Sequence, residues 1–568
     1  MKPENQVRAK HRRLIALAVV LAIGALVIVG RLVYYQVWMH TQLEEMALNQ
    51  REREREVPPE RGNVLDCNGH PLAMSVIQWD ISASPRLVDN PEELAEQLAD
   101  LLDLPRDELY AKLDSDVDWV PLARGCAQEA GEAVAGLKAS GIICEPRALR
   151  VYPEADLAAH LLGIVSDGGV GFIGVEGHYN LWLTGTEGKR EIEENAVGEE
   201  IPLPPHAQMA ATAGTNLILT VDRNIQMIAV EELERAIKEY KAESGTVVIM
   251  NPKTGAILAI ANYPSYDPNS FPEVDGELLA DASVSKIWEP GSIFKVITWA
   301  AGLDSGTISP GTTVYDSGSR EVGGRLLYNW DRKGRGWVTM TDGLALSLNT
   351  VAAFISTSVG KETFYTYVQR FGFGNKTEVD LAGEEPGMVK RPGDSNWFPS
   401  DLGTNAFGQG IAVTPVQMLS AVSAGANHGL LMKPYIVKQF ITADKVVSVE
   451  PMARRQAITE ETAETLTGML VEVVAREATK AQVAGYRIAG KTGTAQVPTA
   501  YGYDPTATIA SFIGFAPADD PQFAVLVKLD KPQASPWANH TAAPTFGAIA
   551  ARLIVYLQIP PDEIRLAQ

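Results

Sequence analysis

The sequence has few cysteines and no excess of basic residues. Three cysteines occur among 568 residues and none belongs to a Cys-x-x-Cys pair, so a zinc or redox motif has little support. We also find no cluster of metal-ligating residues along the chain. Lysine and arginine number 49 against 70 acidic residues, which argues against a nucleic-acid-binding surface. Cys126 and Cys144 either form a disulfide or remain free buried thiols, and the sequence leaves both possibilities open.

Internal repeats and low-complexity tracts of consequence are also lacking. The hydrophobic fraction of 46% and the charged fraction of 21% are ordinary for globular protein and argue against broad disorder. A chain of 568 residues is too long for one ordinary domain, so two or more folded units are expected.

The one long hydrophobic run lies near the N-terminus. Residues Leu14 to Gly30 are all apolar or glycine, and aromatic residues extend the run to Trp38. The five basic residues before it should keep the N-terminus cytoplasmic; they are Lys2, Arg8, Lys10, Arg12 and Arg13. No small-x-small cleavage site follows, so we predict a retained membrane helix over residues 14–38 rather than a signal peptide. The tail 1–13 would be cytoplasmic and all later residues extracytoplasmic.

Two extracytoplasmic domains are predicted. Residues 39–56 are polar and end in alternating arginine and glutamate, which predicts a solvated stalk helix ended by Pro58 and Pro59. A first domain of mixed α/β character is placed at 39–210, with the stiff connector 201–205 near its end. The second domain is placed at 211–568.

The second domain is predicted to begin and end with strands. A strand at 217–221, a helix at 224–240 and a hairpin of strands 245–250 and 256–260 open it. Strands at 486–497, 510–516 and 522–528 and an apolar helix at 542–556 close it. With an all-helical middle, this order predicts an α+β fold in which a sheet carries a helical insert.

Three short motifs follow one another in the order expected of a serine acyl-transfer site. They are Ser292-x-x-Lys295, Ser347-x-Asn349 and Lys491-Thr492-Gly493. Each motif alone is weak, because decoys exist. Ser283-x-x-Lys286 lacks a helix start, Ser358-x-x-Lys361 resembles a helix end with its glycine stop, and Lys253-Thr254-Gly255 lies in the predicted hairpin turn.

Ser292 is the predicted nucleophile. Pro290 and Gly291 break the preceding chain and an apolar run follows, so Ser292 should lie in the first turn of a buried helix. Free N–H groups there favour developing negative charge. Lys295 would share its face and act as the base. Burial and the nearby cation of Lys491 would lower the pKa of Lys295 enough for that role.

The other two motifs are predicted to complete the site. Ser347 and Asn349 can both reach one cleft only from a loop or helix end. There Ser347 would relay a proton to the leaving amine, and Asn349 would hold the Lys295 amine and the substrate amide. The strand of Lys491 is expected to be a sheet edge that binds an extended peptide.

Residues of that strand are assigned to the substrate. Lys491, Thr492 and Thr494 suit a terminal carboxylate, and Gly493 would let the ligand approach closely. The backbone N–H groups of Ser292 and Thr494 would form an oxyanion hole.

Together these groups resemble the transpeptidase domain of class B penicillin-binding proteins. Residues 61–69 are similar to the opening motif of that class's pedestal, in which arginine usually stands where Cys67 stands here. Similarity extends nearly over the whole chain, to about Ile559. Its further segments are 150–153, 158–163 and 174–177 in the pedestal, 263–269 before the nucleophile, and 407–410 and 414–418 before the final strand.

The resemblance implies a fold and an activity. The fold would combine a single transmembrane helix, an elongated mixed α/β pedestal of the class B dimerisation type and a β-lactamase-like penicillin-binding domain. The activity would be that of a peptidoglycan D,D-transpeptidase in the bacterial plasma membrane. Ser292 would attack the D-Ala-D-Ala bond of a stem peptide, an amine of a neighbouring stem would accept the acyl group, and β-lactams would acylate Ser292.

The resemblance also bears on cofactors and partners. No metal or other cofactor is implied, and the implied partner is a polytopic membrane glycosyltransferase that polymerises glycan. The Ser-x-Asn form favours division-type over elongation-type members.

Three other classes of protein could carry similar motifs. A D,D-carboxypeptidase passes the acyl group to water and fits the same motifs. A β-lactamase needs a second glutamate in a Glu-x-x-Leu-Asn setting, which is not found between Asn349 and Lys491. A penicillin sensor or an inactive scaffold fits less well, because one membrane span is present and every catalytic group is retained.

Overall fold

The computed structural model describes residues 3–57, 59–166, 168–193, 208–499 and 502–567. The chain divides into two compact units, one of residues 1–60 and 185–213 and one of residues 61–184 and 214–568. The predicted connector 201–205 lies outside the described residues. The predicted domain boundaries at residues 38 and 210 stay predictions.

The first unit begins with a long apolar helix. Helix α1 (Pro3–Val33) continues into one π-helical turn, η1 (Tyr34–Trp38). Within the described residues, Lys10–Trp38 is the one helical stretch long and apolar enough to cross a membrane. It coincides with the predicted span over residues 14–38.

The stalk prediction is wrong for its last residues. Helix α2 (His40–Arg51) ends early, and β1 (Glu52–Val57) pairs antiparallel with β6 (Gly188–Glu193). Strand β6 pairs in turn with β7 (Gln208–Met209). Alternating charges suit the two-residue period of a strand as well as a helix surface. The partner strand lies far along the chain, so the sequence around residue 52 does not reveal the pairing.

The second unit contains a sheet built mainly from pedestal residues. Its order is β19-β18-β8-β2-β3-β4, and β5 also pairs with β3. The strands are β2 (Val64–Leu65), β3 (Pro71–Ala83), β4 (Val120–Ala127), β5 (Ile142–Val151), β8 (Asn216–Leu219), β18 (Val437–Ile441) and β19 (Val446–Ser448). Strand β8, predicted as the start of the second domain, therefore joins this sheet by parallel pairing with β2.

The same sheet settles the question left open about two cysteines. Cys126 lies on β4 and Cys144 on β5, and β3 runs between these two strands. Two strand spacings amount to about 9.5 Å, whereas a disulfide joins Cα atoms about 4.4–6.8 Å apart. Both thiols are free, and burial raises the pKa of each.

Three charged residues from separate pedestal motifs meet in the interior. Glu176 is fully buried; its carboxylate accepts hydrogen bonds from Arg61 Nε at 2.9 Å and Arg150 Nε at 2.6 Å. Arg61 and Arg150 are themselves less than 10% exposed. A buried carboxylate between two guanidinium groups is compensated in charge and in hydrogen bonds. These contacts explain why charged residues stand at those motif positions.

A second sheet forms the centre of the region predicted as the second domain. Its order is β10-β9-β23-β22-β21, antiparallel throughout. The strands are β9 (Ser244–Met250), β10 (Ile257–Tyr263), β21 (Ala489–Thr499), β22 (Gly502–Ala516) and β23 (Phe523–Asp530). The strand and hairpin predictions for these residues are confirmed to within a few residues, except that β22 begins well before residue 510. Strand β21 is at the edge, as predicted.

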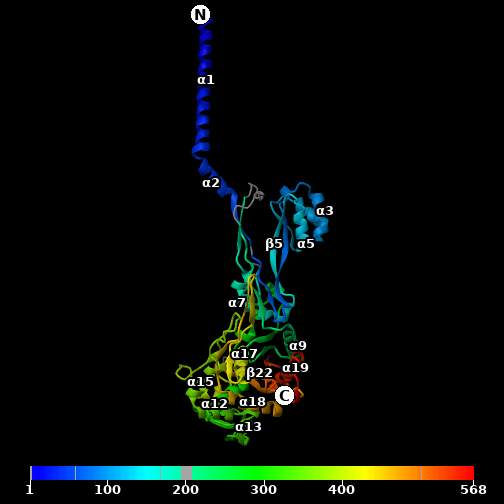
Figure 1. Cartoon of the computed structure of the whole chain (residues 1–568), viewed down its shortest axis with the longest axis vertical. Coiled ribbons are helices and arrows are strands. Elements are labelled where there is room, and N and C mark those ends of the chain that lie inside the picture. Colours follow the sequence, from blue (N-terminus) through cyan, green and yellow to red (C-terminus); the bar gives the residue numbers. More distant parts are fainter. Residues whose placement is uncertain (1–2, 58, 167, 194–207, 500–501, 568) are drawn as a thin grey trace. The chain divides into compact units, whose positions relative to one another are not determined.

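Helices cover both faces of this sheet (Figure 1). Alternate side chains of β9 face opposite ways: Val247 packs in the cluster with α9 (Arg223–Tyr240) and α19 (Ala542–Tyr556), and Val248 in the other. The second cluster contains α12 (Lys295–Asp304), α17 (Pro415–Ala426) and α18 (Glu460–Arg476). The predicted antiparallel sheet flanked by helices is confirmed.

The middle of this region is not all helical, contrary to prediction. Short antiparallel ladders lie there, among them β11 (Thr313–Asp316) with β14 (Gly336–Thr339), and β12 (Ser319–Val322) with β13 (Arg325–Tyr328). Each strand has four residues, too few for a clear alternating pattern. The two ladders together form a small module, residues 313–339, beside α14 (Asn349–Val359).

Candidate active site

The nucleophile segment is a tight turn that leads into a buried helix. A 3-10 turn, η5 (Gly291–Phe294), passes directly into α12. Residues three apart eclipse one another in a 3-10 turn, so Ser292 and Lys295 lie on one side of it. Gly291 has a φ of +56°, and its N–H donates to the Gly408 carbonyl at 3.2 Å. The positive φ explains the glycine before the serine.

Lys295 is fully buried and its amine is completely surrounded. Its Nζ lies 2.5 Å from the Ser347 carbonyl oxygen, 3.1 Å from Ser347 Oγ and 2.9 Å from Asn349 Oδ1. Burial, and secondarily the charge of Lys491, lowers the pKa of Lys295 well below its usual value. A lysine whose pKa is lowered in this way gives up its own proton more readily, so that its neutral form can act as a base.

Ser347 lies on the loop between α13 (Met340–Ala345) and α14. Its φ of +55° is rare for a residue with a Cβ atom. This conformation presents both its carbonyl and its hydroxyl to Lys295. Asn349 Nδ2 donates to the Tyr328 carbonyl at 3.0 Å, which fixes the amide so that its oxygen faces Lys295.

Lys491 approaches the same hydroxyl from the sheet edge. Its Nζ lies 3.1 Å from Ser347 Oγ and 3.0 Å from the Thr492 carbonyl. The side chain is 1% exposed, and burial lowers the pKa of Lys491 to about 7, against a smaller opposing effect of Glu477. A lysine with such a pKa changes charge near neutral pH.

Gly493 faces the protein rather than open space. A Cβ atom there would lie 2.6 Å from Ser511 Oγ and 2.9 Å from Ile293 Cγ2. Close packing of β21 against the nucleophile turn therefore accounts for this glycine without a ligand.

The predicted residues share one cleft of about 490 Å³. Its lining includes Ser292, Ser347, Asn349, Thr492 and Thr494. Lys295 and Lys491 lie beneath, joined to Ser347. The structure thus brings together every side chain of the three motifs except Gly493, which packs behind them.

The decoy motifs lie elsewhere. Ser283 is fully buried in the short helix α11 (Ala282–Ser285), and Ser358 is exposed at the end of α14 before Gly360, as predicted. Lys253 lies in the turn between β9 and β10 and pairs with Asp520. None of the three lines the cleft.

Sequence reasoning missed several residues of the cleft, all on loops or helix ends. They are Trp330, Arg335, Glu477, Trp537, Asn539 and His540. No motif marks these positions, because their meeting depends on how distant loops pack. Glu289 was also missed, although it precedes Ser292 by three residues. Its carboxylate accepts from Gly410 N and from the Tyr503 hydroxyl, both at 2.9 Å, and so ties the nucleophile turn to two neighbours.

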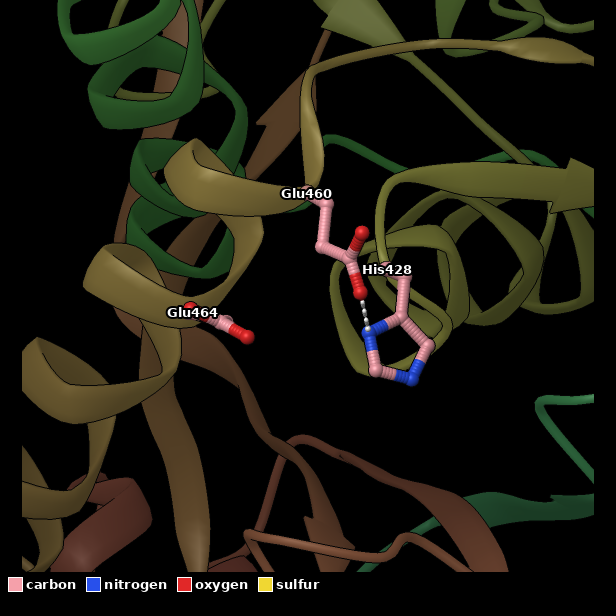
Figure 2. Close-up of side chains that lie close together, drawn as sticks. All are labelled: His428, Glu460 and Glu464. Carbon is pink, nitrogen blue, oxygen red and sulfur yellow. Dashed lines mark ion pairs between the residues drawn. The ribbon is translucent and has the colours of Figure 1, made fainter.

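One group of possible metal ligands lies apart from the cleft (Figure 2). His428 Nδ1 and Glu460 Oε1 are 2.9 Å apart, and Glu464 follows one helical turn later on α18. His428 and Glu460 have side chains 63% and 66% exposed. All three side chains are exposed, so the arrangement is that of a surface pair beside the N-terminus of α18.

Sequence profiles of two protein families match the chain. The profile described as "Penicillin binding protein transpeptidase domain" matches residues 245–551. The profile described as "Penicillin-binding Protein dimerisation domain" matches residues 56–219. The first match contains all three motifs, and the second contains Arg61, Arg150 and Glu176.

Similar proteins match over nearly their full length. Stage V sporulation protein D of Bacillus subtilis is 35% identical over 97% of this chain and 86% of its own. The probable peptidoglycan D,D-transpeptidase PbpC of Pseudomonas aeruginosa is 31% identical over 98% of this chain and 97% of its own. Peptidoglycan D,D-transpeptidase FtsI of Escherichia coli K12 is 28% identical over 99% and 95%.

Solved structures agree with these relatives. A peptidoglycan synthetase of Bifidobacterium adolescentis has a TM-score of 0.75 at 26% identity and covers 90% of this chain and 98% of its own. Penicillin binding protein 3 of Mycobacterium tuberculosis, solved with aztreonam, has a TM-score of 0.70 at 26% identity, with 89% and 98% covered.

Proposed function

Because the chain belongs to the penicillin-binding proteins with a transpeptidase domain, we propose that it is a peptidoglycan D,D-transpeptidase with Ser292 as nucleophile. The observation that carries the proposal is the contact set beneath the cleft. There two buried amines, of Lys295 and Lys491, bind one hydroxyl, that of Ser347.

Acylation follows from this arrangement. The neutral Lys295 amine takes the proton of Ser292 as the serine oxygen attacks the carbonyl carbon of the penultimate D-alanine. The bond to the terminal D-alanine breaks, and its nitrogen receives a proton that Ser347 passes on from Lys295. The Ser292 and Thr494 N–H groups are proposed to hold the oxyanion.

The sheet edge is proposed to hold the rest of the stem peptide. Lys491, Thr492 and Thr494 would bind the terminal carboxylate, and the β21 backbone would pair with the extended peptide. A β-lactam would occupy the same positions and leave a stable ester on Ser292.

The N-terminal helix is proposed to be a single membrane anchor. Basic residues precede it and support a cytoplasmic N-terminus, with the residues after Trp38 outside the plasma membrane. A polytopic membrane glycosyltransferase is the proposed partner, since the matched profiles describe no glycan polymerase.

Penicillin labelling tests the nucleophile. In membranes that contain the Ser292→Ala protein, this protein should not be labelled covalently by fluorescent penicillin. The Ser283→Ala and Ser358→Ala proteins should be labelled like wild type. Persistent labelling of Ser292→Ala would refute the assignment. Incubation of the wild type with polymerised lipid II, followed by mass analysis, should give crosslinked dimers; trimmed monomers alone would identify a carboxypeptidase instead.

A further inference from the structure

Two tryptophans meet across the mouth of the cleft. The rings of Trp330 and Trp537 have centroids 5.1 Å apart and planes inclined by 66°, an edge-to-face contact. Both line the cleft that Ser292 lines. They belong to different rims: Trp330 follows β13 in the 313–339 module, and Trp537 lies between β23 and α19.

Hydrogen bonds fix both loops that carry these tryptophans. Asn329, next to Trp330, is 2% exposed and donates to both carboxylate oxygens of Asp316, at 3.1 and 3.0 Å. Thr350 Oγ1 also binds Asp316, at 2.8 Å, which links this loop to the residue after Asn349. On the other rim, Ala538 N donates to Thr494 Oγ1 at 3.3 Å. The indoles are thus positioned relative to the catalytic motifs.

The two indoles are not buried by their own contact. Trp330 remains 60% exposed and Trp537 43% exposed. Exposed indoles above a cleft can contact a ligand that enters the cleft with their π-faces, and a π-face attracts cations. Above the buried amines of Lys295 and Lys491, the charged residues that line the cleft itself also favour a cation. Glu477 is the one carboxylate among the described lining residues, and the one arginine there, Arg335, is paired with Asp331 at 2.7 Å.

The acyl-enzyme has two possible acceptors. An amine forms a new C–N bond while the ester C–O bond to Ser292 breaks, and the amine proton returns to the serine oxygen through Lys295. Water attacking the same carbon gives a free acid instead. A stem-peptide amine arrives as an ammonium ion and gives one proton to solvent before attack, whereas water carries no charge.

We propose that Trp330 and Trp537 form an acceptor gate that admits primary ammonium groups and disfavours water, so that they set the ratio of crosslinking to hydrolysis. The proposal rests on the acyl-enzyme function proposed above. It assigns the tryptophans to the second half-reaction, in which the ratio of the two products does not depend on how fast the acyl-enzyme forms.

The test uses the full-length protein with polymerised lipid II and measures two quantities. One is the ratio of crosslinked dimer to hydrolysed monomer by mass analysis, and the other is the rate of labelling by fluorescent penicillin. We expect Trp330→Ala and Trp537→Ala each to lower the ratio about two- to fivefold, as loss of a cation–π contact at an exposed site would. Any change in the labelling rate should be smaller than the change in the ratio, because the ratio compares two fates of the same acyl-enzyme.

Matched variants separate the gate from structural effects. Trp337 lies on β14 of the same module, is 73% exposed and does not line the cleft, so Trp337→Ala should leave the ratio unchanged. Trp330→Phe should retain most of the ratio, while Trp330→Leu, which keeps bulk without a π-face, should lose it. This pair decides the question if an alanine variant folds poorly.

Several results would contradict the proposed role of the two tryptophans. They are an unchanged ratio in both alanine variants, an equal fall in Trp337→Ala, or a wild-type ratio in Trp330→Leu. Failure of the transpeptidase assignment itself would be distinct, because the wild type would then yield no dimer at all.

Discussion

Lys491 donates a hydrogen bond of 3.1 Å to the hydroxyl of Ser347, although the two residues are 144 positions apart in the chain. The contact joins the edge of the five-stranded sheet to the loop before α14. The floor of the cleft therefore carries two amines whose charges affect one another. Preorganised groups of this kind need no rearrangement when charge develops.

The pH dependence of penicillin binding should report the charge of Lys491. Burial lowers the pKa of Lys491 to about 7, so above that pH the amine loses the charge that attracts a carboxylate. We expect the second-order rate constant for acylation by a carboxylated penicillin to fall as pH rises through about 7, as stopped-flow measurements would show. A rate that rises steadily from pH 6 to pH 9 would contradict this.

The same shift predicts a change in stability. The folded pKa of Lys491, about 7, lies below its ordinary value of 10.5, so the unfolded chain binds more protons between these values. The free energy of unfolding contributed by this residue therefore rises with pH across that window. We expect the melting temperature of wild type minus that of Lys491→Met to increase from pH 7 to pH 9. A constant difference would show that Lys491 keeps its ordinary pKa.

Removal of the Lys295 amine should stop acylation without unfolding the protein. Lys295→Ala takes away the proposed base, which should slow penicillin acylation by about 10²–10⁴-fold. Thermal melting should still show a folded chain. The matched control is Lys286→Ala, the exposed lysine of a decoy motif. Acylation at the wild-type rate in Lys295→Ala would place the base elsewhere.

Two variants of Ser347 separate the effect of its backbone strain on stability from the effect of its hydroxyl on acylation. Its φ of +55° is unfavourable for alanine but free for glycine. Ser347→Gly should therefore be more stable than Ser347→Ala by about 1 kcal/mol, while both lose the proton relay and slow acylation similarly. Urea unfolding and penicillin labelling measure the two effects separately. Equal stabilities would mean that the loop relaxes when the hydroxyl is removed.

The sequence could predict much of the central sheet, because its strands are apolar runs bounded by turn residues. The 245–250 and 256–260 runs, for example, form β9 and β10 with ends that differ by at most three residues. The order of the three motifs along the chain was enough to predict that Ser292, Ser347 and Lys491 belong to one site. The sequence could not predict β1, whose charged residues suit helix and strand alike, or its pairing with β6.

Contacts between loops could not be predicted from the sequence either. Trp330 and Trp537 lie in loops without a motif, and nothing near either residue reveals the other. The αL backbone at Ser347 was missed for a different reason, because serine gives no local sign of a positive φ. These features depend on tertiary packing, which acts on residues far apart in the chain.

The buried Glu176 should matter for stability and not for chemistry. Glu176→Ala leaves the guanidinium groups of Arg61 and Arg150 buried without their carboxylate, which should lower the free energy of unfolding by about 3–5 kcal/mol. Glu92→Ala is the control, because its pair with Arg106 is exposed and should cost less than about 1 kcal/mol. Urea unfolding of both variants measures the difference. Since Glu176 does not line the cleft, folded Glu176→Ala protein should take up penicillin at the wild-type rate. If it unfolds no earlier than Glu92→Ala, the pedestal motifs are not held together by this charge cluster.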